Sequence, residues 1–226
     1  MNLNSRLKIS FQGKEDLPSW AITHYLQQTE INYLKFLLVE RICDLISNGL
    51  DPNSLVVATS SAEIFPKKAI QHSDFKNFEI LAEKDESAKK FWHVIARHHR
   101  PMVFYKEGDN FVPIYIPNDD NSLIIRNVGV NSPVNLSLEG AGGAITDIYY
   151  ASEREQRQRT QWENEQVGQV ARNVDDIVRA STTANQPGVP EGVRAYAQEI
   201  LDQAMKRQEK LNEEIGMSNA RVDTQA

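Results

Sequence analysis

The chain has 226 residues, of which 40% are hydrophobic, 25% charged and 8% aromatic, and its formal net charge is −6 at pH 7. By area scaling, a chain of this length buries roughly 72% of its unfolded surface, so a folded core is expected and collagen-like, low-complexity and wholly disordered classes are excluded. The acidic balance argues against nucleic acid or an anionic membrane as the main partner. No apolar run approaches the ~20 residues of a membrane-spanning helix, so we expect no transmembrane segment.

The only cysteine and the N-terminal pattern both predict a cytoplasmic location. Cys43 has no second cysteine with which to form an internal disulfide or a thiolate zinc cluster, which agrees with a reducing compartment. Residues 1–18 alternate polar and apolar side chains and lack the continuous apolar stretch of a secretory signal.

Short runs of β-branched and aromatic residues, bounded by turn-forming residues, predict the strands. In chain order, the predicted strands cover residues 7–11, 55–59, 102–106, 111–116, 123–130 and 134–138. The composition of residues 107–110 predicts a hairpin turn, and Asn131-Ser132-Pro133 joins the last two strands. These short connections favour a mostly antiparallel sheet.

Apolar residues spaced three and four apart predict the helices. The predicted helices cover residues 19–48, 86–99, 144–183 and 193–215. Ser19 is the expected N-cap of the first, which is interrupted near Gln28 and closed by Asn48-Gly49. Pro101 ends the second. The breaker cluster at residues 185–190 separates the last two and predicts that they fold back as an antiparallel hairpin.

Together these elements predict an α+β fold in which a small, mostly antiparallel sheet with packed helices is followed by a long C-terminal α-helical hairpin. We divide the chain into an α+β sheet domain over residues 1–140, a helical hairpin arm over 141–216 and a flexible tail over 217–226. An unbroken helix from Ala144 to Thr183 measures ~60 Å at 1.5 Å per residue, so part of the arm is expected to project.

The most polar helical segment, residues 152–166, is a candidate interaction surface. A helix that is polar on all sides either bridges solvent or pairs with a partner. Glu153 precedes Arg157 by four residues, an arrangement that supports an exposed helix. Trp162 is the exception to this polarity and is a candidate interface anchor, although it equally fits a residue that covers the end of the core. The candidate interaction residues are Trp162, Arg154, Arg157 and Arg159.

A glycine-rich junction between the last strand and the following helix is a weak candidate for anion binding. Gly140, Gly142 and Gly143 allow backbone N–H groups to approach an anion at a helix N-terminus. No Lys-Ser or Lys-Thr follows, so the P-loop pattern is absent, and Glu139 adds a negative charge. The alternative is a turn whose small residues let the helix start close to the sheet.

The helix over residues 86–100 carries a group of basic side chains that fits anion contact or an ordinary solvated face. The candidate contacts are Lys89, Lys90, Arg97 and Arg100. In a nucleic-acid interface they contact phosphates, with Phe91 or Trp92 available for base stacking.

The sequence contains no familiar catalytic motif. There is no Gly-x-Ser-x-Gly elbow, no His-Glu-x-x-His and no kinase Asp-Phe-Gly set. His93 and His98 lie five residues apart, which is not the i, i+4 spacing of a helical zinc site. The apolar neighbours of Cys43 indicate a packed thiol. We therefore assign no catalytic, cofactor-binding or metal-binding residue and expect no cofactor.

Residues 123–140, LIIRNVGVNSPVNLSLEG, with the small-residue junction and charged helix that follow, resemble uncharacterised bacterial proteins with a TRADD-N-like domain. The resemblance implies a compact α+β adaptor domain of bacterial conflict and immunity systems, and it supplies no catalytic residue. Many of those relatives have an apolar stretch after the second strand, whereas residues 140–150 are short and polar, so no membrane role carries over.

These observations favour a non-enzymatic protein–protein interaction or adaptor module of the cytoplasm. In this hypothesis the C-terminal helices mediate assembly, as a coiled coil with a protein partner or a second copy. The rival hypothesis is a nucleotide- or small-molecule-binding domain, catalytic or not, in which Gly140–Gly143 and the basic helix over 86–100 face one cleft. A third, nucleic-acid binding through the basic helix, predicts affinity that falls steeply with salt.

Overall fold

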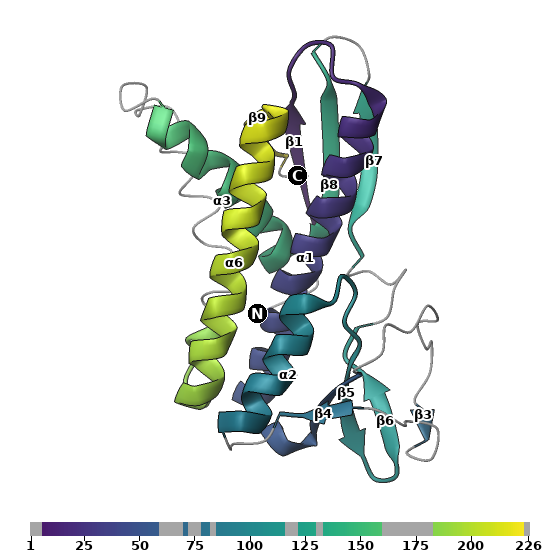
Figure 1. The fold of residues 1–226 in the computed structure, drawn as a ribbon, viewed down its shortest axis with the longest axis vertical. Helices are drawn as coiled ribbons and strands as arrows, with labels where there is room; N and C mark the ends of the chain where they lie inside the picture. Colours follow the sequence, from purple (N-terminus) through teal and green to yellow (C-terminus); the bar gives the residue numbers. More distant parts are fainter. Residues whose placement is uncertain are drawn as a thin grey trace.

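The longest of the described helices, α1 (Ser19–Ser47), connects the two ends of the molecule (Figure 1). The computed structural model describes residues 6–58, 70–71, 78–81, 85–115, 122–129, 133–159 and 183–223. Every residue from Ile31 to Glu40 is buried, so protein surrounds this part of α1 on all sides. A helix that is buried all round lacks a polar stripe, and α1 accordingly forms the centre of the core.

The ends of α1 agree only in part with the sequence prediction. Pro18 in an extended conformation occupies the N-cap without a side-chain hydrogen bond, so the prediction that Ser19 caps the helix was wrong. Ser19 is already helical, since its carbonyl oxygen accepts a hydrogen bond from Thr23 Oγ1 at 3.1 Å. The helix also continues past Gln28 without interruption. At the other end, Asn48 is the C-cap and Gly49 follows with φ +97°, as predicted.

The strands form two antiparallel sheets, and the predicted α+β class is confirmed. In spatial order, the first sheet contains β7 (Ile124–Gly129), β8 (Asn135–Ala141), β1 (Arg6–Gln12) and β9 (Ser218–Asp223). The second contains β3 (Ile70–Gln71), β6 (Asn110–Pro113), β5 (Val103–Glu107), β2 (Leu55–Ala58) and β4 (Phe78–Ile80).

The length of α1 explains why the strands do not share one sheet. At 1.5 Å per residue, a helix of 29 residues is roughly 43 Å long, so it places β1 and β2 far apart. The short apolar strands after α1 then pair among themselves, with Val56 opposite both Ile80 and Phe104. The strands before α1 and after residue 123 pair at the other end, with Ile9 opposite Leu138.

The C-terminal tail is not wholly flexible as predicted, because residues 218–223 form strand β9. This strand pairs with β1, with Val222 opposite Ile9. β8 occupies only one edge of β1, and β9 supplies partners for the backbone groups of the other edge. Met217, which precedes β9, is buried.

Three further α-helices of the described residues cover the core. They are α2 (Asp85–Arg97), α3 (Gly142–Arg159) and α6 (Glu191–Ile215). Figure 1 shows α6 lying alongside α1 and α2, while the C-terminal end of α3 points away from the rest of the molecule. The long C-terminal helix is confirmed, and it packs along α1. Its expected antiparallel partner lies mostly within residues 160–182, outside the described residues.

One continuous buried cluster spans the predicted boundary at residue 140. It includes Ile9 and Leu37 from the predicted sheet domain together with Tyr149, Leu201 and Met217 from the predicted arm and tail. The division of the chain into independent domains stays a prediction, and the side chains of α6 contribute directly to the same core as β1 and α1.

Candidate functional site

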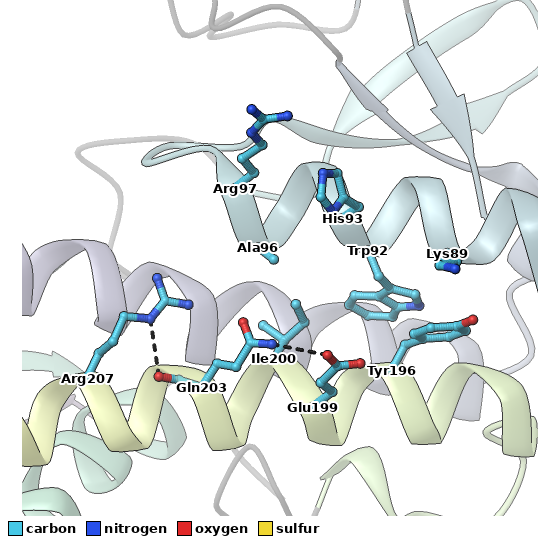
Figure 2. Close-up of a pocket in the computed structure, with 10 residues that line it drawn as sticks. All are labelled: Lys89, Trp92, His93, Ala96, Arg97, Tyr196, Glu199, Ile200, Gln203 and Arg207. Carbon is cyan, nitrogen blue, oxygen red and sulfur yellow. Dashed lines mark hydrogen bonds between the residues drawn. The ribbon is translucent and has the colours of Figure 1, made fainter.

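A groove of about 480 Å³ lies between α2 and α6 (Figure 2). Its volume falls within the ~300–1,000 Å³ range that is typical of ligand pockets. The lining residues are Lys89, Trp92, His93, Ala96 and Arg97 of α2, and Tyr196, Glu199, Ile200, Gln203 and Arg207 of α6. Their spacing of three and four residues places each set on one face of its helix, so two facing helices build the whole groove.

The walls of the groove combine an apolar floor with charged edges. Trp92 and Ile200 are buried, Tyr196 and Ala96 are half-buried, and the charged side chains are exposed. Lys89, Arg97 and Arg207 oppose one carboxylate, Glu199, among the described lining residues. The groove is therefore locally cationic in a chain whose formal net charge is −6.

Hydrogen bonds along α6 hold the polar edge of the groove in place. Gln203 Nε2 donates to Glu199 Oε1 at 3.1 Å, and Arg207 Nε donates to the Gln203 carbonyl oxygen at 3.2 Å. Figure 2 shows Arg207 rising from α6 on the side of α2, whereas Arg97 extends away from α6. Lys89 and Arg207 are thus the cationic side chains that best approach a ligand between the two helices.

The indole of Trp92 carries an unsatisfied donor at this groove. The side chain is 1% exposed and packs edge-on against Phe91, with ring centroids 5.4 Å apart. Among the described residues, its buried Nε1 has no hydrogen-bond partner. Figure 2 shows the nitrogen end of the ring pointing toward Tyr196 and Lys89. Leaving a buried donor without an acceptor costs about 1–3 kcal/mol, so an acceptor supplied by a ligand would be favourable at this N–H group.

The burial of these rings contradicts the predicted base stacking. Phe91 and Trp92 are 0% and 1% exposed, so neither offers a face to a base. Helical spacing predicted that both rings lie on the apolar side of α2. That side packs into the core of the protein, where both rings are buried. Phe91 and Trp92 therefore provide no platform for base stacking beside the basic side chains of α2.

A buried lysine lies behind the groove and connects α1 to α2. Lys35 is 0% exposed, and its Nζ donates hydrogen bonds to the carbonyl oxygens of Ile95 and His98. A cation is favourable beside the C-terminal carbonyls of a helix. Burial, with repulsion from Arg207, lowers the pKa of Lys35 to about 7. The pKa of His98 is lowered by burial and then by Lys35 and other cations.

A buried polar network fixes α6 on α1. Its buried members are Tyr25, Thr29, Asn32, Gln208 and Asn212. Tyr25 OH donates to Asn212 Oδ1 at 3.0 Å, and Asn32 Nδ2 donates to Gln208 Oε1 at 2.9 Å. Gln208 Nε2 donates to Thr29 Oγ1 and to Asn212 Oδ1, both at 3.1 Å. Since these bonds form in one register only, they determine which residues of α6 face α2.

The glycine junction faces α1 and leaves no room for an anion. A Cβ on Gly140 would lie 2.7 Å from Tyr33 Cε2, and one on Gly143 would overlap the Glu40 carboxylate. Tyr33 OH accepts a hydrogen bond from the Ala141 N–H at 2.8 Å. Burial raises the pKa of Glu40 to about 7, with Arg41 opposing this and Asp147 reinforcing it. The glycines therefore permit close packing on α1, beside an acidic side chain.

The structure does not bring the glycines and the basic helix into one cleft, so that prediction was wrong. Lys89 and Arg97 line the α2–α6 groove, whereas Gly140 and Gly143 pack on α1. Gly142 begins α3. Lys90 is exposed outside the groove, and Arg100 forms an ion pair with Glu30 at 2.8 Å.

The predicted interaction residues of the arm stay predictions. Arg154, Arg157 and Arg159 belong to α3, but the structure describes only their backbone, and Trp162 lies outside the described residues. Sequence reasoning missed the α6 side of the groove. The available signal was the recurrence of Tyr196, Gln203 and Arg207 on one side of a helix whose opposite side is apolar.

No protein-family model, curated protein or solved structure matches this chain. Within the described part of the chain, no group of three or more histidine, cysteine, aspartate or glutamate side chains is arranged to hold a metal ion. No described helix combines the length and apolar character needed to cross a bilayer. The resemblance to TRADD-N-like proteins stays a prediction.

Proposed function

We propose that the protein is a non-enzymatic interaction module that binds an acidic segment of a partner protein in the groove between α2 and α6. The observation that carries this proposal is the combination of Lys89 and Arg207 at the edges of an apolar floor formed by Trp92 and Ile200. Apolar contact on the floor supplies affinity, and the cations select an acidic sequence through charge complementarity.

The shape of the site favours a peptide segment over a nucleotide. The groove is an open trough between two helices, which suits an extended or helical segment laid along it. The buried rings of Phe91 and Trp92 offer no stacking surface to a base. The rigid pairing of α6 with α1 keeps the groove preformed, which lowers the entropic cost of binding.

A peptide-display selection on the full chain tests the proposal. Random twelve-residue peptides selected against the wild-type protein are expected to be enriched in Asp and Glu. The double variant Lys89→Glu, Arg207→Glu is expected to lose at least ten-fold in affinity for them, because it reverses both groove cations.

The matched control is Lys90→Glu, Lys206→Glu, which changes the net charge equally on the same two helices at exposed positions outside the groove. It is expected to bind within two-fold of wild type. Equal losses in both double variants, or no acidic enrichment, would contradict binding in the groove.

A small anionic ligand is the second candidate, because the groove volume also suits a molecule of nucleotide size. Thermal-shift measurements across nucleotides and other small anions test it, since a ligand at 100 times its Kd stabilises the fold by ~2.7 kcal/mol. Stabilisation by such a ligand that is lost in Lys89→Glu, Arg207→Glu would favour this candidate over a peptide.

Assembly through the C-terminal helices and a cytoplasmic role in bacterial defence or signalling remain part of the proposal. The first is supported by the polar segment around Trp162 and the second by the TRADD-N-like resemblance. Light scattering on the full chain tests self-association, and a monomer at all concentrations would contradict it. Truncation near Tyr150 is unsuitable as a test, because it removes α6 and β9 from the core.

A further inference from the structure

We infer that the indole N–H of Trp92 is a specificity-determining donor, which hydrogen-bonds a carboxylate oxygen of the acidic segment bound in the α2–α6 groove. This inference rests on the proposed function and deepens it. Charge at the groove edges distinguishes an acidic segment from a basic one. A buried donor adds a directional requirement, namely an acceptor at one defined position.

The first observation is the unmet hydrogen-bonding capacity of Trp92. Two other buried side-chain atoms in the described part of the chain lack partners, Arg194 Nε and Asn212 Nδ2, and neither residue lines the groove. Of these three residues, Trp92 is the one that lines the groove. Its indole nitrogen can donate a hydrogen bond but cannot accept one. An acceptor from a ligand in the groove would give this donor its hydrogen bond.

The second observation is the charge around that donor. In Figure 2 the nitrogen end of the indole points toward Lys89 and the Tyr196 ring. Lys35 lies toward the other end of α2, where it donates to the carbonyl oxygens of Ile95 and His98. An acceptor that reaches Nε1 thus lies at the Lys89 end of the groove, and this cation favours a carboxylate over a neutral amide oxygen.

The third observation explains how the donor is kept dry before binding. Trp92 Nε1 is closed to solvent, and Figure 2 draws the half-buried Tyr196 at the same end of the groove as the indole nitrogen. The inference requires side chains at this end of the groove to move aside so that the carboxylate reaches the nitrogen. Binding then replaces an unsatisfied buried donor with a charge-assisted hydrogen bond, which a neutral peptide of equal shape does not provide.

Nuclear magnetic resonance of the ¹⁵N-labelled full chain reports on this hydrogen bond directly. The probes are acetylated, amidated hexaglutamate and its neutral counterpart, hexaglutamine. The indole ¹H–¹⁵N signals of Trp20, Trp92 and Trp162 are assigned with single Trp→Phe variants. Hexaglutamate is expected to move the Trp92 indole proton downfield and to leave the signal of Trp20 in place, because Trp20 is 70% exposed on α1 and does not line the groove.

Replacing Trp92 with benzothienylalanine, an isostere without the N–H, separates the hydrogen bond from packing. This variant is expected to keep or raise the thermal midpoint, because it removes an unsatisfied buried donor, and to lose about ten-fold in hexaglutamate affinity. Trp92→Phe is a second variant, and if it folds poorly, the isostere and the wild-type titration still decide the question.

The outcomes separate a failure of this inference alone from a failure that also includes the proposed function. If hexaglutamate binds and Lys89→Glu, Arg207→Glu abolishes binding while the Trp92 indole signal stays in place, the inference is overturned and the proposed function stands. An equal shift with hexaglutamine overturns the requirement for a carboxylate. If hexaglutamate binds to neither the wild type nor any variant, both are overturned.

Discussion

Helix α6 takes part in two polar surfaces that are built in opposite ways. Against α1 it presents neutral amides, which are buried and bonded to one another through Gln208 and Asn212. Within this network, as far as the structure describes it, only Asn212 Nδ2 lacks a partner. Against α2 it presents Glu199 and Arg207, which are exposed, beside a buried indole donor that has no partner among the described residues. Hydrogen bonds that are completed within the chain fix structure, whereas donors and charges left open are available to a ligand.

The contrast predicts that the two faces of α6 respond differently to the loss of a glutamine. Gln208→Ala is expected to destabilise the fold by about 3 kcal/mol, because it leaves the buried Asn32 amide and the Thr29 hydroxyl without their partner. Gln203→Ala, on the exposed groove side of the same helix, is expected to cost under about 0.5 kcal/mol. Urea denaturation measures both, and similar losses would contradict the distinction.

A second prediction concerns the glycines that bring α3 close to α1. Gly143→Ala is expected to cost about 1–3 kcal/mol, because its Cβ overlaps the Glu40 carboxylate in a packed region. Gly192→Ala on α6, where a Cβ meets nothing within 4 Å, is the matched control and is expected to be neutral or to stabilise by up to about 1 kcal/mol.

A double-mutant cycle identifies the cause of the Gly143 effect. If the overlap with Glu40 is responsible, Gly143→Ala costs less in a Glu40→Ala background than in the wild type. If the losses in stability from Gly143→Ala and Glu40→Ala are strictly additive, the Glu40 carboxylate is not what limits the size of residue 143.

The buried charges of α1 predict a stability profile with opposite slopes on either side of neutral pH. The pKa of Lys35 is lowered to about 7, so above pH 7 the unfolded chain binds more protons and stability rises with pH. The pKa of Glu40 is raised to about 7, so between its ordinary value of 4.5 and pH 7 stability falls with pH. Each slope reaches at most about 1.4 kcal/mol per pH unit, the value for one proton.

Single variants assign these slopes, which are measured by urea denaturation. Lys35→Met is expected to remove the rise between pH 7 and 9, and Glu40→Gln the fall between pH 4.5 and 7. Measurements stop at pH 9, the ordinary pKa of a cysteine thiol, because burial raises the pKa of Cys43 to about 12 and this thiol opposes the rise above that point. Lys90→Met, on the exposed side of α2, is the control. If stability still rises between pH 7 and 9 in Lys35→Met, the rise is not due to Lys35.

The helices and most strands were readable from the sequence because local periodicity determines them. The alternation over β1 and the apolar spacing in α6 predicted both elements and their buried sides. The division into two sheets was not readable, since strand pairing depends on how far α1 separates its ends. Strand β9 has the polar sequence SNARVD and is a strand because β1 offers it an unpaired edge.

The candidate site was half readable for a related reason. The positions of Lys89 and Arg97 on α2 followed from helical spacing, and the structure places both at the groove. Their counterparts Tyr196 and Arg207 depend on the pairing of α2 with α6, which is a long-range contact. Lys35 and Glu40 interrupt the apolar pattern of α1, and charge at such positions ordinarily marks a solvated face.

The smallest predicted effect sharpens the contrast between the two faces of α6. Glu199 is the carboxylate among the described lining residues of the groove, and Gln203 holds it beside the binding surface. An acidic segment must approach this charge, so Glu199→Gln is expected to strengthen hexaglutamate binding two- to five-fold, the modest gain typical of an exposed charge.

Glu213→Gln is the matched control, since this exposed carboxylate of α6 does not line the groove. Titration by isothermal calorimetry at two salt concentrations compares the variants. The gain should shrink as salt rises, because exposed charges are screened within about 10 Å at 0.1 M. A gain of the same size in Glu213→Gln would mean that the net charge of the chain, and not the groove, controls binding.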